Sequence, residues 1–152
     1  PFLQAQLEKF TFVPIAVGTG RFEALEMMRN AMAEVIANQQ EPVLIIASSD
    51  MNHYESDGIT RQKDALAIDR ILALDARGLF DTVNEQKISM CGYGPAVAML
   101  TAARRLGATS AELIKYATSG DVSGDRDMVV GYAGIAVTGV PRRKSTALSS
   151  EH

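Results

Sequence analysis

The chain has 152 residues, of which 47% are hydrophobic and 22% charged, and its formal net charge is −3. This length and composition fit one ordinary globular domain, and the acidic balance gives no basis for binding nucleic acid or an anionic membrane. No apolar run approaches the roughly 18 residues of a membrane-spanning helix, and a lone cysteine, Cys91, excludes an intrachain disulfide, so we expect a cytoplasmic protein.

The first part of the chain predicts strands that alternate with a helix. Residues 12–17 are apolar and β-branched, which indicates a buried strand that ends at Gly18. Residues 20–38 carry apolar side chains at helical spacing. The continuous apolar run at 43–48 is typical of a central parallel strand that is covered on both faces.

The middle of the chain predicts three helices. Apolar side chains recur at helical spacing around 65–72 and along 96–106, and a short helix is expected at 76–85. Gly107 is suited to end the last of them in a left-handed conformation. Three aspartates are expected at solvated helix or capping positions: Asp64, Asp69 and Asp75.

Two strands follow, at about 112–118 and 129–137. The link 119–125 has the composition of a calcium loop but lacks its spacing and closing glutamate, so a surface turn is expected. The element order predicts an α/β fold with helices packed on a mixed sheet. We expect residues 1–140 to belong to a single domain and residues 141–152 to form a polar, basic tail.

The densest cluster of reactive side chains is 48–54, directly after the apolar run. In open α/β sheets, ligands bind in the crevice beyond the carboxyl ends of the strands. Asp50 and His53 are three residues apart, so one turn can bring both to the same side, where histidine serves as base, acid or metal ligand. The alternative is a capping aspartate beside an incidental histidine.

Cys91 is the second candidate for chemistry. It precedes the predicted start of a helix, where the free N–H groups favour a thiolate that a metal or an oxidant could meet. The alternative is a buried structural cysteine, which is the commoner fate of a lone cysteine.

Four motifs in the same order resemble the Memo family, and the resemblance runs from Pro1 to about Val137. The motifs are Ser48–Tyr54, Cys91–Pro95, Tyr116–Asp121 and Val130–Ala133. The resemblance implies the fold of the class III extradiol dioxygenases, an αβα sandwich with a central sheet.

The same resemblance implies roles for three residues. In the related dioxygenases two histidines and a carboxylate hold Fe(II), and a further histidine acts as acid and base. Memo-like proteins place a cysteine where the carboxylate ligand stands. By that correspondence Cys91 is the metal ligand, His53 the catalytic histidine and Asp50 the residue that orients His53.

The family's two N-terminal histidine motifs have no counterpart here. The resemblance therefore implies that this chain covers the C-terminal half of a single Memo-like domain. Pro1 is not an initiator methionine, which either an omitted start or a removed upstream half would explain. The cofactor is expected to be a transition metal (iron, copper or zinc) that also needs ligands from the missing N-terminal half.

The leading functional hypothesis is a metal-dependent redox protein or oxidoreductase acting on a small molecule. The alternatives are a non-catalytic signalling adaptor that binds a peptide in the same crevice, and an accessory protein of a radical-SAM-associated modification pathway. A phosphopeptide pocket needs converging basic residues. Those nearest the motifs are Arg61 and Lys87, which favours the metal hypothesis.

Two structural expectations follow. His53 and Cys91 should lie at one end of the sheet, with side chains within about 12 Å of each other. The strand at 43–48 should have an unpaired edge beside exposed apolar surface, covered by the missing N-terminal half or by a second copy in a homo-oligomer.

Overall fold

A computed structural model describes residues 2–139 of the chain, and the tail predicted at 141–152 lies outside this range. The elements are α1 Phe2–Gln6, α2 Phe22–Ala37, β1 His53–Glu55, α3 Asp57–Leu72, α4 Ala76–Glu85, α5 Tyr93–Leu106, β2 Ala108–Thr118, α6 Gly120–Ser123 and β3 Val129–Gly139. Within the described range, no helix is long and apolar enough to cross a membrane.

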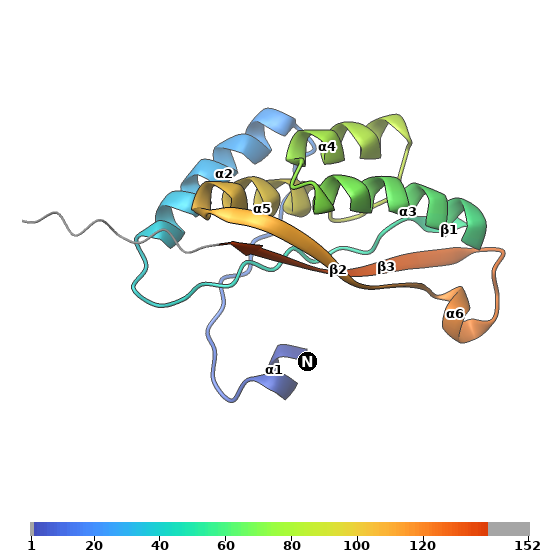
Figure 1. The fold of residues 1–152 in the computed structure, drawn as a ribbon, viewed down its shortest axis with the longest axis horizontal. Helices are drawn as coiled ribbons and strands as arrows, with labels where there is room; N and C mark the ends of the chain where they lie inside the picture. Colours follow the sequence, from blue (N-terminus) through green and yellow to red (C-terminus); the bar gives the residue numbers. More distant parts are fainter. Residues whose placement is uncertain (1, 140–152) are drawn as a thin grey trace, which may run out of the picture.

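The strands form one antiparallel sheet in the order β1-β3-β2. β2 and β3 pair along their whole length, from Ala108 opposite Gly139 to Thr118 opposite Gly131. β1 is short and pairs with the start of β3. Helices α2 to α5 lie together on one face of this sheet, whereas α1 lies on the opposite side (Figure 1).

The core lies within the helical layer and between it and the sheet. α5 packs against α2 and α4, and α3 packs against α4 and both long strands. The largest completely buried apolar side chains come from these elements: Leu25, Leu79, Val97, Leu100 and Val129. Burial of such side chains stabilises the fold by about 1.5–3 kcal/mol each.

Most of the predicted helices and the final two strands are confirmed. The helices predicted at 20–38 and 76–85 match α2 and α4, and α5 ends at Gly107 in the left-handed conformation with φ of 105°. The predicted pair of strands is the β2–β3 hairpin, and the link between them holds only the single turn of α6. Asp75 caps α4, as expected, by accepting a hydrogen bond from the Gly78 N–H at 2.8 Å.

Two predicted strands are wrong for the described chain. Residues 12–17 and 43–48 run as extended segments that make no backbone hydrogen bonds to other described segments. The expected mixed sheet is likewise wrong, because all described pairings are antiparallel. A strand exists only where a neighbour accepts and donates its ladder hydrogen bonds, and the described residues supply no such neighbour to either segment.

The described residues also form one helical layer rather than the two of the expected αβα sandwich. The helices of that layer cover a single face of the sheet (Figure 1). The observed architecture is therefore an α/β fold with a small antiparallel sheet and helices on one side.

Candidate metal centre

Two separate parts of the chain bring three potential metal ligands together. Asp50 and His53 lie where the extended segment 43–50 enters β1, and Cys91 lies two residues before α5. One ligand atom from each residue lies within 4.8 Å of those of the other two. The expectation that His53 and Cys91 lie close together is thus confirmed. The Cys91 side chain is exposed, so the alternative of a buried structural cysteine is wrong.

His53 is held by Ser89 at two points. Its backbone N–H donates to the Ser89 hydroxyl at 2.7 Å, and its ring nitrogen Nδ1 contacts the Ser89 carbonyl oxygen. A carbonyl can only accept, so this contact requires the proton on Nδ1, and in the neutral ring the lone pair is then on Nε2. Nε2 lies 3.5 Å from the Asp50 carboxylate. Nε2 therefore faces Asp50, and Ser89 sets the orientation of the ring.

Cys91 receives a hydrogen bond from the loop that carries Asp50. The Asp50 backbone N–H donates to Sγ at 3.3 Å. The Gly92 N–H in turn donates to the Ser49 hydroxyl at 2.8 Å, which fixes the two loops against each other. Metal-bound thiolates commonly accept N–H hydrogen bonds of this kind, which tune the metal.

Asn52 joins the same two loops from inside. Its side chain is completely buried, and its Oδ1 accepts hydrogen bonds from the Ser89 backbone N–H and hydroxyl, each at 3.0 Å. Its Nδ2 donates to Glu55 at 2.7 Å and lies 3.3 Å from the Thr60 hydroxyl. Because every polar atom of the amide is used, Asn52 fixes the spacing between the loop of His53 and the loop that leads to Cys91.

Asp64 supports this arrangement from α3, and here the expectation of a solvated position is wrong. Its side chain is fully buried and accepts the Asn52 backbone N–H at 2.8 Å and the Tyr116 hydroxyl at 2.6 Å. Burial raises the pKa of the Asp64 carboxyl, although both hydrogen bonds oppose that shift. Burial and the neighbouring carboxylate raise the pKa of Tyr116 as well. Thr60, Ala67 and Ile71 share the Asp64 side of α3 at helical spacing, and this signal could have revealed its burial.

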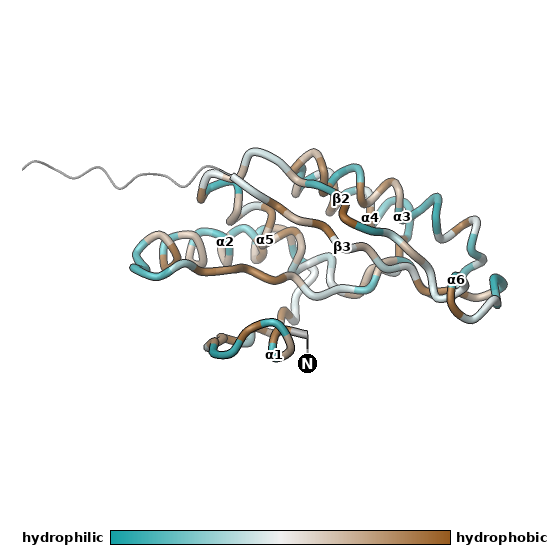
Figure 2. The backbone as a smooth tube through the Cα atoms, turned by 60° about the horizontal axis from the view of Figure 1, so that its bottom comes forward, coloured by the Kyte–Doolittle hydropathy of each residue, from teal (hydrophilic) through white to brown (hydrophobic). Residues whose placement is uncertain are grey.

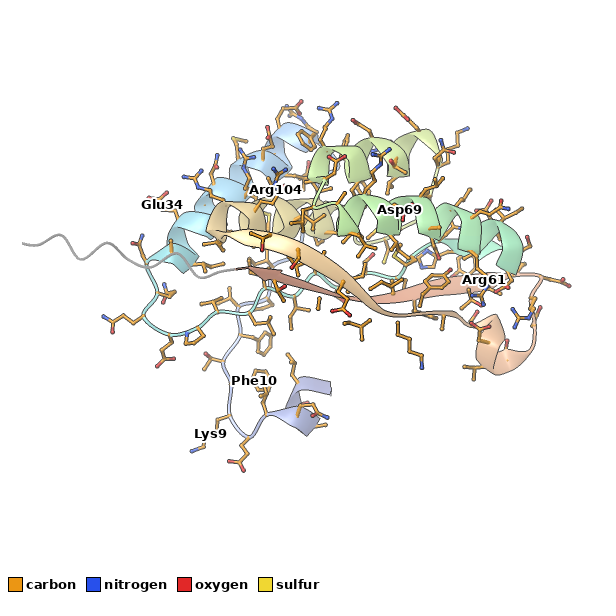
Figure 3. All side chains as sticks on the ribbon, viewed as in Figure 1. Lys9, Phe10, Glu34, Arg61, Asp69 and Arg104 are labelled. Carbon is orange, nitrogen blue, oxygen red and sulfur yellow. The ribbon has the colours of Figure 1, made fainter. Side chains whose placement is uncertain are left out.

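A separate ionic cluster ties the start of α3 to the α6 turn. Arg61 pairs with Asp57 at 2.9 Å and with Asp121 at 2.8 Å, and Arg126 contacts both carboxylates. Figure 3 shows Arg61 at the end of the molecule where α6 lies. The Arg61 hydrogen bond, with a further one from Thr118, lowers the pKa of Asp57 to about 2. This cluster holds the turn between β2 and β3 against the start of α3. The sequence contains no motif at this spacing that would have predicted it.

The comparisons with known proteins agree on one family. The model of the Memo-like protein family matches residues 1–136. A MEMO1 family protein of Methanosarcina mazei is 46% identical over 138 residues, which are 90% of this chain and 52% of that protein. One of Methanocaldococcus jannaschii is 41% identical over 141 residues, 90% of this chain and 49% of that protein. The chain spans about half the length of the curated relatives it matches, and it belongs to the Memo family.

Proposed function

We propose that the chain contributes to a metal centre of an oxidoreductase, or of a metal-dependent redox protein, that acts on a small molecule on a dioxygenase-like scaffold. The observation that supports this most strongly is the convergence of Asp50, His53 and Cys91, with ligand atoms within 4.8 Å. The three residues come from two parts of the chain 38 to 41 positions apart in sequence, and hydrogen bonds hold those parts together.

The donor set fits a transition metal. The thiolate of Cys91, with the carboxylate oxygen of Asp50 beside it, suits zinc, iron or copper, whereas magnesium and calcium prefer oxygen ligands alone. Cys91 and about half of the Asp50 side chain are open to solvent, so an ion has access to both. Such an ion would supply Lewis acidity or, for iron and copper, electron transfer.

Each residue has a distinct role in the proposal. Cys91 is the metal ligand, and His53 moves a proton at Nε2, the ring nitrogen that Ser89 does not contact. Family resemblance implies that Asp50 orients His53. The contact of Ser89 with Nδ1 already orients the ring, which supports a second role for Asp50 as a direct ligand beside Cys91.

Metal titration by competition tests these assignments. Zn²⁺, Cu⁺ and Mg²⁺ are titrated into the chain and into Cys91→Ser, Asp50→Asn and His53→Ala. The matched control is Asp69→Asn, an exposed carboxylate of α3 (Figure 3). Cys91→Ser should weaken Zn²⁺ and Cu⁺ binding by about tenfold or more and leave Mg²⁺ nearly unchanged, since thiolate is the softest donor.

The other variants separate the remaining roles. His53→Ala should spare metal affinity and reduce turnover in a full-length family protein. If Asp50 is a ligand, Asp50→Asn should weaken Zn²⁺ binding; if it only orients His53, affinity should persist. Because Cys91 and Asp50 together would leave most of the coordination sphere to water, this chain alone should bind weakly. Zn²⁺ binding that ignores Cys91→Ser, or tight stoichiometric binding by the chain alone, would contradict the proposal.

A further inference from the structure

Tyr54 has an unusual backbone conformation for its place in the fold. Its φ is 61°, in the left-handed region that bulky side chains rarely adopt. Two other non-glycine residues of the described chain share this conformation, Leu74 and Lys87, and each lies just beyond the C-terminal cap of a helix. A left-handed residue commonly ends a helix at that position. Tyr54 lies inside β1 instead, so the end of a helix does not explain its conformation.

A β-bulge accompanies this conformation. His53 pairs with Val130 and Glu55 with Val129, so Tyr54 is the extra residue between two pairs that are adjacent along β3. In a regular strand the side chains of His53 and Tyr54 would point to opposite faces of the sheet. Here the two rings lie beside each other, with centroids 5.6 Å apart and planes tilted by 43°. The bulge therefore redirects the Tyr54 ring toward the candidate metal centre.

The Tyr54 ring is open to solvent, although the ring beside it is mostly covered. Tyr54 is 70% exposed, whereas the His53 side chain is 16% exposed. An exposed ring adds little buried area, and a left-handed backbone lowers stability, so folding does not account for a tyrosine at this position. Residues that the surrounding structure holds in such strained conformations cluster at active sites and ligand-binding sites. The combination of strain and exposure points to contact with a ligand.

The chain turns from apolar to polar shortly before Tyr54. It is hydrophobic along 43–47 and hydrophilic at Ser48, Ser49 and Asp50 (Figure 2). Small-molecule sites combine aromatic or apolar surface with a few polar groups that fix the orientation of the ligand. The candidate metal centre supplies the polar groups, and Tyr54 supplies an aromatic face beside them. A flat ring can stack on that face.

The charges near the Tyr54 ring disfavour an anionic ligand. The Asp50 side chain is 49% exposed and lies 3.5 Å from His53, the neighbour of the Tyr54 ring. Lys63 is already paired with Glu55 at 2.7 Å. An anion stacked on Tyr54 would meet the negative face of the ring and lie close to the Asp50 carboxylate, without a free Lys63 to offset either. A ligand without charge meets no such repulsion.

We propose that Tyr54 is a substrate-binding residue of the candidate metal centre and stacks on a flat, uncharged ring of the small molecule that reacts there. This assignment rests on the proposed function, because it requires the substrate to bind beside His53 and Cys91. It adds the residue that selects the substrate and the shape of the group that is selected. The selecting group is the aromatic ring of Tyr54 and not its hydroxyl.

Titration of the metal-free chain with phenol tests this proposal. Phenol carries a flat, uncharged ring, cyclohexanol has the same number of heavy atoms but is not flat, and benzoate is flat but anionic. Each probe is added up to about 50 mM while the amide resonances of His53, Tyr54 and Cys91 are followed, because ligands of this size bind in the millimolar range. Phenol should bind at least about threefold more tightly than cyclohexanol or benzoate, as expected for an aromatic pair.

Four variants separate the role of the ring from its effect on folding. Tyr54→Phe keeps the ring and should bind phenol as the wild type does, whereas Tyr54→Leu should bind it at least about threefold more weakly. The matched control Tyr132→Leu removes a tyrosine of β3 that is 46% exposed, and it should leave phenol binding unchanged. Tyr54→Gly should also lose phenol binding. It should nevertheless unfold at no lower denaturant concentration than the wild type, because glycine accepts the left-handed backbone.

Four results would overturn the proposal. They are the absence of phenol-dependent shifts, phenol binding that Tyr54→Leu leaves unchanged, equal binding of phenol and cyclohexanol, and a Tyr54→Gly variant that is clearly less stable than the wild type. No metal enters these titrations, so they are independent of the metal-binding measurements. Phenol selectivity in a chain whose Zn²⁺ binding ignores Cys91→Ser would count against the metal centre alone. Zn²⁺ binding that depends on Cys91 without phenol selectivity would count against the role of Tyr54 alone.

Discussion

Gly92 joins the two loops of the candidate metal centre, and adding one methyl group there should separate them. A Cβ on residue 92 would lie 2.4 Å from the Ser48 carbonyl oxygen and 2.6 Å from the Ser49 Cβ. The backbone conformation, with φ of −106° and ψ of 27°, accepts any L-residue, so the penalty of Gly92→Ala is purely steric.

The size of the effect follows from these distances. An ordinary contact starts at 3.4 Å, so relief of the clash with the Ser48 oxygen requires about 1 Å of movement, the difference between the two distances. Metal ligands must be placed within about 0.5 Å. We therefore expect about a tenfold or greater loss of Zn²⁺ affinity, together with a loss of about 1–3 kcal/mol in the free energy of unfolding from overpacking.

Two measurements check this prediction, with Gly58→Ala as the control. Nothing lies within 4 Å of a Cβ at Gly58, in the first turn of α3, so that variant should be neutral or slightly more stable. Zn²⁺ competition reports the affinity. The amide resonance of Asp50, which donates to Cys91 Sγ at 3.3 Å, reports the movement without metal. If Gly92→Ala retains wild-type affinity and an unshifted Asp50 amide, the steric reasoning is refuted.

Three further predictions concern stability, each checked by denaturant unfolding. Asn52→Ala leaves buried hydrogen-bond partners unsatisfied and should lower the free energy of unfolding by about 2–4 kcal/mol. The control Asn84→Ala removes an exposed hydrogen bond to a helix carbonyl and should change it by less than about 0.5 kcal/mol. Equal effects of the two variants would show that Asn52 does not hold the two loops together. Gly131→Ala places a Cβ 1.8 Å from a carboxylate oxygen of the buried Asp64 and should lower the free energy of unfolding by about 1–3 kcal/mol. The control Gly134→Ala, whose Cβ would lie 4.0 Å from its nearest neighbour, should raise it by about 0.5 kcal/mol. A Gly131→Ala variant as stable as the wild type would contradict this close packing. The pKa of Asp57 lies at about 2 in the folded chain against an ordinary 3.8, so its ionised form contributes stability above about pH 4 that is lost as the pH falls toward 2. Asp57→Asn should therefore lose less stability than the wild type across this pH interval. Identical dependence of stability on pH in the two proteins would show that the ionic cluster around Asp57 does not contribute.

Local patterns in the sequence determined the helices and the final hairpin. The apolar spacing of α2 and α5, the cap at Asp75 and the left-handed Gly107 are set by neighbours within four residues, so they could be read along the chain. The proximity of His53 and Cys91 could be predicted because four motifs occur in the same order as in the Memo family. The comparisons confirm that this chain belongs to that family.

Contacts between distant residues decided the rest. Asp64 is buried only because β3 and the Asn52 loop close over it, and the tautomer of His53 depends on the carbonyl of Ser89, 36 positions away. The segments 12–17 and 43–48 have strand sequences but are not strands here. An apolar run determines that a segment prefers burial, whereas a strand also needs hydrogen-bonding neighbours, and only the tertiary structure decides whether those neighbours are present.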